Sequence, residues 1–187
     1  RRLITKRGST PSRRAWQPSF KRSAGRFEPG RGSVFQPMPE VVLVNCRGRI
    51  VPERREHLGL GCLASYLRGE GIDTQIVDGH FDRLDARDIA RRVSELRPTV
   101  VGFTIFFSNQ AEALATARLV RGLPSVRHIC RGGHHASFRP GSLLADPAVD
   151  AVVRGEGELT LPELVRRVRR KQEWRATPGL AVRDAAG

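Results

Sequence analysis

The chain has 187 residues, of which 39% are hydrophobic and 28% are charged, and its formal net charge is +14. This length and composition suit one globular domain with tails, and the absence of any run of about 18 apolar residues excludes a transmembrane helix. The N-terminus also lacks the apolar stretch of a secretory signal, so we expect a cytoplasmic protein with no membrane contact.

Most of the excess positive charge lies near the N-terminus. Residues 1–38 contain ten Lys or Arg and one acidic residue, and they are rich in Ser, Gly and Pro without apolar periodicity. Such a segment buries too little surface to offset the entropy of ordering, so we predict a disordered basic tail. It is a candidate for binding nucleic acid, but a solvated block of charge is the favoured interpretation.

Five apolar segments beyond the tail predict β-strands. "VVLVN" (41–45) and "TVVGFTIF" (99–106) are continuous apolar runs, typical of strands buried on both faces. "DTQIVDG" (73–79), "VRHIC" (126–130) and "DAVVRG" (150–155) are the others.

Helical patterns separate these strands. Asp85 with Asp88 three residues later marks one helix start, Asn109 caps another, and Thr160 with Pro162 opens the last helix. The predicted helices cover 58–71, 85–98, 109–124, a short piece of 137–147, and 160–172.

This alternation predicts an α/β domain with a doubly wound, five-stranded parallel sheet of the flavodoxin-like, Rossmann-like type. We assign residues 39–173 to this domain and residues 174–187 to a linker or the start of a further domain. In such sheets ligands bind beyond the carboxyl ends of the strands, so the residues after each strand are the candidate site.

Two kinds of ligand site are alternatives for these loops, a dinucleotide site and a metal site. "GLGCLA" (59–64) matches a dinucleotide-binding pattern with Asp78 as the ribose acid, but thirteen residues separate Asn45 from Gly59, whereas the mechanism needs the glycine directly after the strand. Helix packing is the favoured interpretation of these glycines. His134 and His135 suggest a metal site, but adjacent side chains diverge and no ligand partner is suitably spaced, so we expect no protein-built metal centre.

The three cysteines give no further site. Cys46, Cys62 and Cys130 are widely spaced and form neither a disulfide framework nor a metal motif, so free thiols are expected.

A third interpretation comes from several segments in order. "LGLGCLASYLRGEG" (58–71), "PTVVGFTIFFSN" (98–109), "RGGHHASF" (131–138) and "VRGEGE" (153–158) together resemble the cobalamin-binding domain of cobalamin-dependent radical S-adenosylmethionine enzymes. The resemblance covers roughly residues 39–184. It implies a cobalamin-binding module of a methyltransferase-type enzyme, in which the cofactor brings the reactive cobalt and the protein supplies binding and orientation.

The resemblance also implies the residues of the site. The loop after the first strand lacks the Asp-x-His-x-x-Gly motif of the wider fold, so no protein histidine is expected on cobalt, and His57 is a poor substitute. The implied cofactor-binding residues are Asn45, Leu58, Gly59, Asp78, Thr104, Phe106, Ser108, Gly132, Gly133, His135, Gly155 and Glu156.

Gly132 and Gly133 suit a broad, flat ligand, because glycine lets the backbone approach it closely. We expect Gly133→Val to prevent cobalamin binding while the ligand-free domain still folds. An ordinary turn is the alternative role of this glycine pair.

No catalytic centre is expected in this chain. The Cys-x-x-x-Cys-x-x-Cys motif of a [4Fe–4S] cluster is absent from the sequence, so the cluster and S-adenosylmethionine are expected only in a missing or partner domain such as a radical S-adenosylmethionine barrel. The alternative function is a non-catalytic interaction protein with a degenerate cofactor fold and a nucleic-acid-binding tail.

Overall fold

A computed structural model of the chain describes residues 38–48, 56–134, 136 and 140–183. These ranges fall within the unit Gln36–Gly187. The other unit, Arg1–Phe35, lies outside the described residues, and so does the predicted basic tail apart from Met38.

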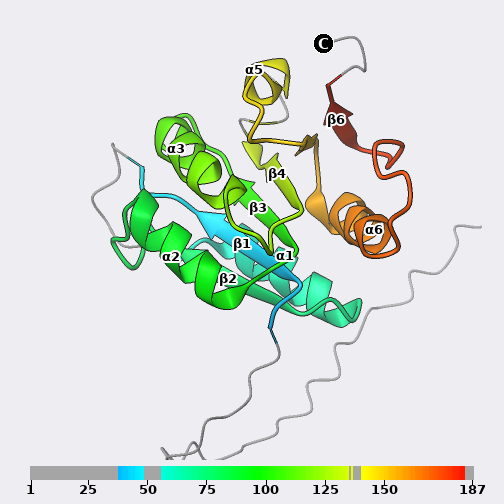
Figure 1. The fold of residues 1–187 in the computed structure, drawn as a ribbon, viewed down its shortest axis with the longest axis horizontal. Coiled ribbons are helices and arrows are strands. Elements are labelled where there is room, and N and C mark those ends of the chain that lie inside the picture. Colours follow the sequence, from blue (N-terminus) through cyan, green and yellow to red (C-terminus); the bar gives the residue numbers. More distant parts are fainter. Residues whose placement is uncertain (1–37, 49–55, 135, 137–139, 184–187) are drawn as a thin grey trace, which may run out of the picture. The chain divides into compact units, whose positions relative to one another are not determined.

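The strands form one six-stranded sheet with the order β2-β1-β3-β4-β5-β6 (Figure 1). The first five strands in this order are parallel, and β6 pairs antiparallel with β5 at the edge. The strands are β1 (Val41–Asn45), β2 (Thr74–Asp78), β3 (Val100–Thr104), β4 (His128–Gly132), β5 (Ala151–Val153) and β6 (Leu180–Val182). The predicted doubly wound, flavodoxin-like fold is confirmed, because this order reverses direction between β1 and β3.

The sequence predicted five strands, and β6 is the difference. It lies in the segment 174–187 that was expected to be a linker or the start of a further domain. Its three residues are only half-buried, and such a short run carries no period that separates an edge strand from an extended tail. Pairing with β5 makes it a strand, and this contact exists only in the folded chain.

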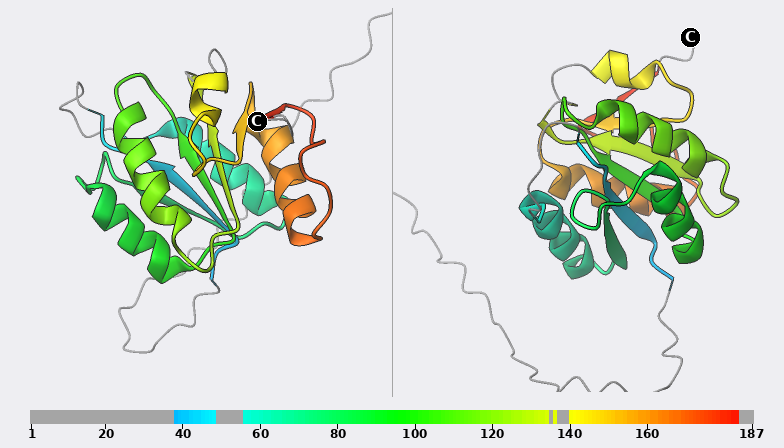
Figure 2. Two further views of the ribbon diagram at one scale, coloured as in Figure 1. Left: turned by 45° about the horizontal axis from the view of Figure 1, so that its top comes forward. Right: turned by 90° about the vertical axis from the view of Figure 1, so that its left-hand side faces the viewer.

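Helices cover both faces of the sheet (Figure 2). α1 and α6 lie on one face, and α2, α3 and α5 lie on the other. The helices are α1 (Leu58–Gly69), α2 (Ala86–Leu96), α3 (Gln110–Arg121), α5 (Pro140–Leu144) and α6 (Gly157–Arg169). Among the described residues, none of the helices combines the length and the apolar composition that crossing a membrane requires.

The helix starts follow local capping chemistry. Asp85 accepts hydrogen bonds from the backbone N–H groups of Arg87 and Asp88, and the Asp88 side chain bonds back to the Asp85 N–H, which confirms the predicted cap of α2. The predicted start of the last helix is wrong. α6 begins at Gly157 rather than Thr160, and Pro162 lies inside it, because the preceding residues already adopt helical geometry after the extended Glu156.

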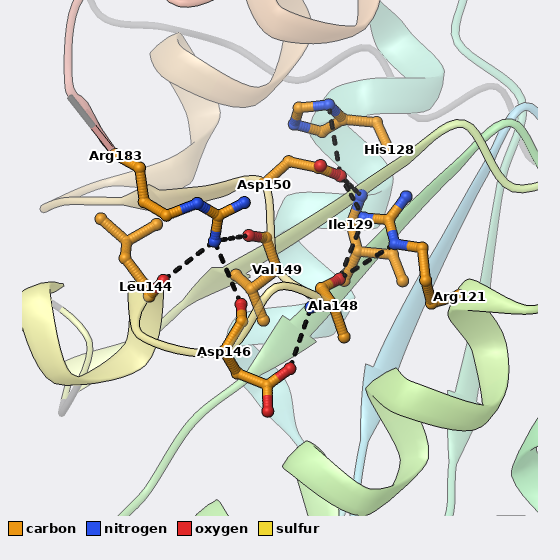
Figure 3. A network of polar contacts seen from close by, with 9 residues as sticks. All are labelled: Arg121, His128, Ile129, Leu144, Asp146, Ala148, Val149, Asp150 and Arg183. Atoms are coloured by element: carbon orange, nitrogen blue, oxygen red, sulfur yellow. Dashed lines mark hydrogen bonds and ion pairs between the residues drawn. The ribbon is translucent and has the colours of Figure 1, made fainter. Parts of the chain in front are cut away.

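A polar network stabilises the edge of the sheet that is formed by β5 and β6 (Figure 3). Arg121 of α3 forms an ion pair with Asp150 and donates to the Ala148 carbonyl at 2.9 Å, while Asp150 accepts from the backbone N–H of Ile129 at 2.7 Å. Arg183, directly after β6, donates to the carbonyls of Leu144, Asp146 and Val149 at 2.9, 3.1 and 2.8 Å. These contacts hold the edge strand against the loop that precedes β5.

His128 at the start of β4 provides a stability prediction. Its side chain is 3% exposed, its Nδ1 lies 3.7 Å from Asp150, and its ring packs edge-on against Trp174. Burial lowers the pKa of His128 to about 4, so the unfolded chain binds this proton more readily than the folded one. The contribution to the free energy of unfolding is therefore complete above the ordinary pKa of 6.5 and is lost as the pH falls from there toward 4, by up to about 1.4 kcal/mol per pH unit.

Urea unfolding between pH 4.5 and 7.5 measures this effect. We expect His128→Phe, which keeps a ring in the core, to lose this part of the pH dependence while other groups titrate as before. The same pH dependence in parent and variant would contradict the prediction.

Candidate functional site

The sheet register brings four predicted site residues into one row. Asp78, Asn45, Thr104 and Gly132 end β2, β1, β3 and β4, and each is the direct register partner of the next. They therefore lie level at the carboxyl edge of the sheet, across the point where the strand order reverses. This is the place at which doubly wound sheets bind ligands.

An inner cavity of about 170 Å³ runs from this row along the face covered by α1 and α6. Gly102 in the middle of β3 and Gly132 at the end of β4 form part of its floor, where a side chain would otherwise stand. A Cβ atom on Gly102 would approach the Leu43 side chain to 3.1 Å, so the glycine at this position makes room for Leu43. Its lining residues are Leu43, His57, Gly59, Leu60, Leu63, Gly102, Phe103, Thr104, Cys130, Gly132, Gly133, Val153, Gly155, Glu156, Gly157, Glu158 and Leu161.

An outer cavity of about 410 Å³ lies over the ends of β1 and β3. His57 and Gly59 line both cavities, so the start of α1 separates the two spaces. The outer lining residues are Asn45, Cys46, Gly48, Glu56, His57, Leu58, Gly59, His80, Phe106, Ser108 and Asn109.

His57 is fixed by two hydrogen bonds at this junction. Its Nδ1 accepts from the backbone N–H of Leu60 at 3.1 Å and so caps α1, and its Nε2 lies 3.3 Å from Oγ1 of Thr104. The ring is tilted against Phe106 with the centroids 5.3 Å apart. Burial lowers the pKa of His57, partly offset by the Asp78 carboxylate, and favours the neutral imidazole that this arrangement requires.

Two polar side chains shape the loops around the row. Asn109 accepts from the backbone N–H of Phe106 at 2.8 Å and donates to the carbonyls of Cys46 and Thr104 at 3.3 and 3.2 Å. It thus ties the loops after β1 and β3 together. Asn109 is the N-cap residue of α3 as predicted, but its side chain makes no cap hydrogen bond to that helix. Asp78 accepts from the Asn45 side chain at 2.9 Å, which fixes Asn45 at the edge of the outer cavity.

The two glycines of the "RGG" segment differ in whether the surrounding protein leaves room for a side chain. Gly133 has φ +94°, and a Cβ there would meet Thr104 Oγ1 at 3.0 Å and the Ile105 nitrogen at 3.2 Å. A Cβ on Gly132 would meet nothing closer than Val153 at 3.6 Å, an ordinary contact. The expectation that Gly133→Val leaves the ligand-free fold intact stays a prediction, but the strained backbone and the close contacts show that the protein itself disfavours a side chain at position 133.

The start of α6 supplies the opposite wall of the inner cavity. Glu156 is its N-cap but makes no side-chain cap bond, and Gly155 before it has φ +69°. Backbone N–H groups of the first helical turn have no partners within a helix. They are therefore suited to bind acceptor atoms of a ligand in this cavity.

Exposed apolar side chains stand around the two openings. Leu58 at the start of α1, Phe107 after β3 and Leu159 in the first turn of α6 are 79%, 79% and 77% exposed. They come from three separate elements at the carboxyl end of the sheet, where an apolar ligand or a second protein surface would cover them.

The structure brings most of the predicted site residues to these two cavities. Asp78 lines neither cavity and acts through Asn45, and His135 lies outside the described residues. The rest line one cavity or both: Asn45, Leu58, Gly59, Thr104, Phe106, Ser108, Gly132, Gly133, Gly155 and Glu156.

The structure also describes the glycines of the dinucleotide-like motif, the possible metal ligands and the cysteines. Gly59 and Gly61 lie within the first turn of α1, not in the turn after β1 that a dinucleotide motif needs. Within the described part of the chain, no group of three His, Cys, Asp or Glu side chains is placed to hold a metal ion. The three cysteines are free thiols, and burial raises the pKa of Cys46 and Cys130 to about 12, which makes both inert.

Two residues that line the inner cavity, Gly102 and His57, were not predicted as site residues. Gly102 carries a recognisable signal, since a glycine inside an apolar strand often marks a close approach to that strand. His57 carries no comparable signal, because forty-seven residues separate it from Thr104.

Comparison with known proteins bears on this site. The sequence model of the B12 binding domain family matches residues 42–165, a range that spans β1 to α6.

Curated relatives include several methyltransferases. The chain is 35% identical over 137 residues to an uncharacterized methyltransferase of Pyrococcus horikoshii, covering 73% of this chain and 30% of that protein. It is 32% identical over 137 residues to the hopanoid C-3 methylase of Methylococcus capsulatus, covering 72% of this chain and 26% of that protein. The chain thus spans less than a third of the length of these relatives.

Solved structures share the fold. OxsB, a cobalamin-dependent S-adenosylmethionine radical enzyme solved with aqua-cobalamin and S-adenosylmethionine bound, has a TM-score of 0.71 at 24% identity, covering 81% of this chain and 21% of OxsB. TsrM from Kitasatospora setae, a radical S-adenosylmethionine methyltransferase, has a TM-score of 0.69 at 23% identity, covering 79% of this chain and 29% of TsrM.

The glycine pair allows a stability test without any ligand. We expect Gly133→Ala to lower the free energy of unfolding by about 1–3 kcal/mol, because alanine is strained at positive φ and collides with Thr104. Gly132→Ala should stay within about 0.5 kcal/mol of the parent, because its added methyl group makes only ordinary contacts. Urea unfolding of both variants measures the difference, and equal losses would contradict this division of roles.

Proposed function

This chain belongs to the B12-binding domain family, and we propose that it binds cobalamin as the cofactor module of a radical S-adenosylmethionine methyltransferase. The observation that carries the proposal is the inner cavity between the sheet and α1 with α6, whose floor lacks side chains at Gly102 and Gly132. A side chain at Gly132 would protrude into this space while costing the protein itself little.

The two cavities suit the two parts of cobalamin. The inner one is narrow and offers the Thr104 hydroxyl and the backbone start of α6, which suit the phosphate and polar groups of the nucleotide tail. The outer one is wider and largely apolar, with Leu58 and Phe106 on its walls, which suits the edge of a flat corrin. We therefore assign the nucleotide to the inner cavity and the corrin to the outer opening.

We further propose that no protein histidine binds cobalt. The support is that both ring nitrogens of His57, the histidine between the cavities, are already engaged, one with the Leu60 N–H and one with Thr104. Ligation by His57 would require breaking the cap of α1 or the contact with Thr104.

A second domain or partner completes the proposed enzyme. Methylcobalamin, when bound, supplies a methyl group for transfer, while this chain binds the cofactor, orients it and keeps water away from its buried face. The exposed side chains Leu58, Phe107 and Leu159 around the openings are suited to packing against a radical S-adenosylmethionine barrel, which would hold the [4Fe–4S] cluster and S-adenosylmethionine. The chain's small share of its relatives' length is consistent with that arrangement.

Titration with hydroxocobalamin, followed by ultraviolet–visible absorption, tests the cofactor. We expect the parent to bind one equivalent and Gly132→Val to bind at least about tenfold more weakly, since a branched side chain fills the inner cavity. The matched control is Gly141→Val in α5, because position 141 faces open space and lines neither cavity. No binding by the parent, or equal loss in both variants, would refute the proposed site.

Electron paramagnetic resonance of the cobalt(II) form tests whether a nitrogen atom of the protein or of dimethylbenzimidazole binds cobalt. We expect a spectrum without nitrogen superhyperfine splitting, because neither dimethylbenzimidazole nor a histidine occupies that position in the proposed complex. Comparing chain labelled with ¹⁵N and unlabelled chain identifies the source of any splitting. A pattern that changes with the label would show a protein nitrogen on cobalt and overturn this part of the proposal.

A further inference from the structure

We propose that His57 is a positioning residue that makes Thr104 a hydrogen-bond donor to the nucleotide part of cobalamin. The inference rests on the proposed function and goes beyond it, because it assigns a role to a residue that is not itself expected to bind cobalt. The observation that carries it is the pair of hydrogen bonds of His57, one at each ring nitrogen.

The first step is the tautomer of His57. The backbone N–H of Leu60 can only donate, so Nδ1 of His57, 3.1 Å away, has to be the acceptor and carries no hydrogen. In a neutral imidazole the hydrogen is then on Nε2. Nε2–H therefore donates to Oγ1 of Thr104, 3.3 Å away.

The second step is the direction of the Thr104 hydroxyl. A hydroxyl has one hydrogen and accepts through its lone pairs, so once Oγ1 accepts from His57, its own hydrogen cannot point toward that ring. The Thr104 side chain has no other hydrogen bond to the described residues. Because Thr104 is buried and lines the inner cavity, its hydrogen is left for an acceptor in that cavity.

The third step is the identity of the acceptor. Thr104 lines the inner cavity and not the outer one, so it faces the part of the ligand that enters between the sheet and α1. The inner cavity, with a volume of about 170 Å³, leaves room for a narrow group and not for a macrocycle. We therefore assign the acceptor to the ribose–phosphate or base portion of the nucleotide, and not to the corrin amides.

A purely structural role for His57 makes a different prediction. If His57 acts only as the cap of α1, any good cap should replace it. His57→Asn keeps a capping oxygen near the position of Nδ1 but is too short to reach Thr104. His57→Gln can place an amide N–H near the position of Nε2 and donate to Thr104, but it caps poorly. The two variants thus separate the two hydrogen bonds.

The experiment measures the dissociation constants of hydroxocobalamin and of aquacobinamide, which lacks the nucleotide, for the parent and four variants. The variants are His57→Asn, His57→Gln, Thr104→Val and the double variant His57→Asn/Thr104→Val. We expect His57→Asn and Thr104→Val to weaken cobalamin binding about 3- to 10-fold each, the magnitude of one lost hydrogen bond. The double variant should be no weaker than Thr104→Val alone, and His57→Gln should recover most of the affinity despite a lower melting temperature.

Cobinamide binding and nuclear magnetic resonance complete the test. All variants should bind cobinamide within about twofold of the parent, because the nucleotide is absent. In the ligand-free parent, imidazole ¹⁵N shifts should report the Nε2–H tautomer, and Thr104→Val should change the Nε2 shift while the Nδ1 shift stays that of an acceptor.

The outcomes separate this inference from the proposed function. A parent that binds neither corrinoid would refute the proposed function. A parent that binds cobalamin while His57→Asn binds equally well, or while the two single losses add in the double variant, would overturn the role of His57. Equal losses with cobinamide would also overturn it, because the acceptor would then lie on the corrin.

Discussion

The parallel pairing of β1 with β3 is the constraint from which the rest of the site follows. Both strands are buried along their whole length, so every backbone group between the helix layers has to be paired within the sheet. The register of this pairing sets Asn45 level with Thr104, and the same alignment continues to Asp78 on one side and Gly132 on the other. Because the chain leaves β1 toward one face and β3 toward the other, the loops diverge and open a crevice above this row.

The crevice is preserved by two different uses of glycine. At Gly132 the missing side chain leaves space in the inner cavity that a ligand can fill, because a Cβ there would make only an ordinary contact with Val153. At Gly133 the backbone conformation and the neighbouring Thr104 exclude a side chain whether or not a ligand is present. Gly132 thus provides space for a ligand, and the adjacent Gly133 provides a backbone conformation that the protein requires with or without a ligand.

Polar contacts stabilise two separate parts of the domain, the edge formed by β5 and β6 and the carboxyl edge that carries the candidate site. Around β5 and β6, Arg121 and Arg183 donate to backbone carbonyls, and Asp150 pairs with Arg121 and accepts from the backbone N–H of Ile129 (Figure 3). At the carboxyl edge, Asn109 joins the loops after β1 and β3, and His57 joins α1 to β3. The second set holds the walls of the cavities together from elements that are distant in sequence, and Thr104 lines the inner cavity beside it.

The sequence by itself determined the order and type of the main elements, because alternating apolar strands and amphipathic helices are local patterns. It also indicated the site, since the ends of parallel strands meet at one edge whatever the loops contain. Local pattern was insufficient for β6, whose three residues become a strand only by pairing with β5, and for Pro162, which lies inside α6. The different roles of Gly132 and Gly133, and the contact between His57 and Thr104, were decided only by the tertiary structure, because they depend on distances between atoms that the fold brings together.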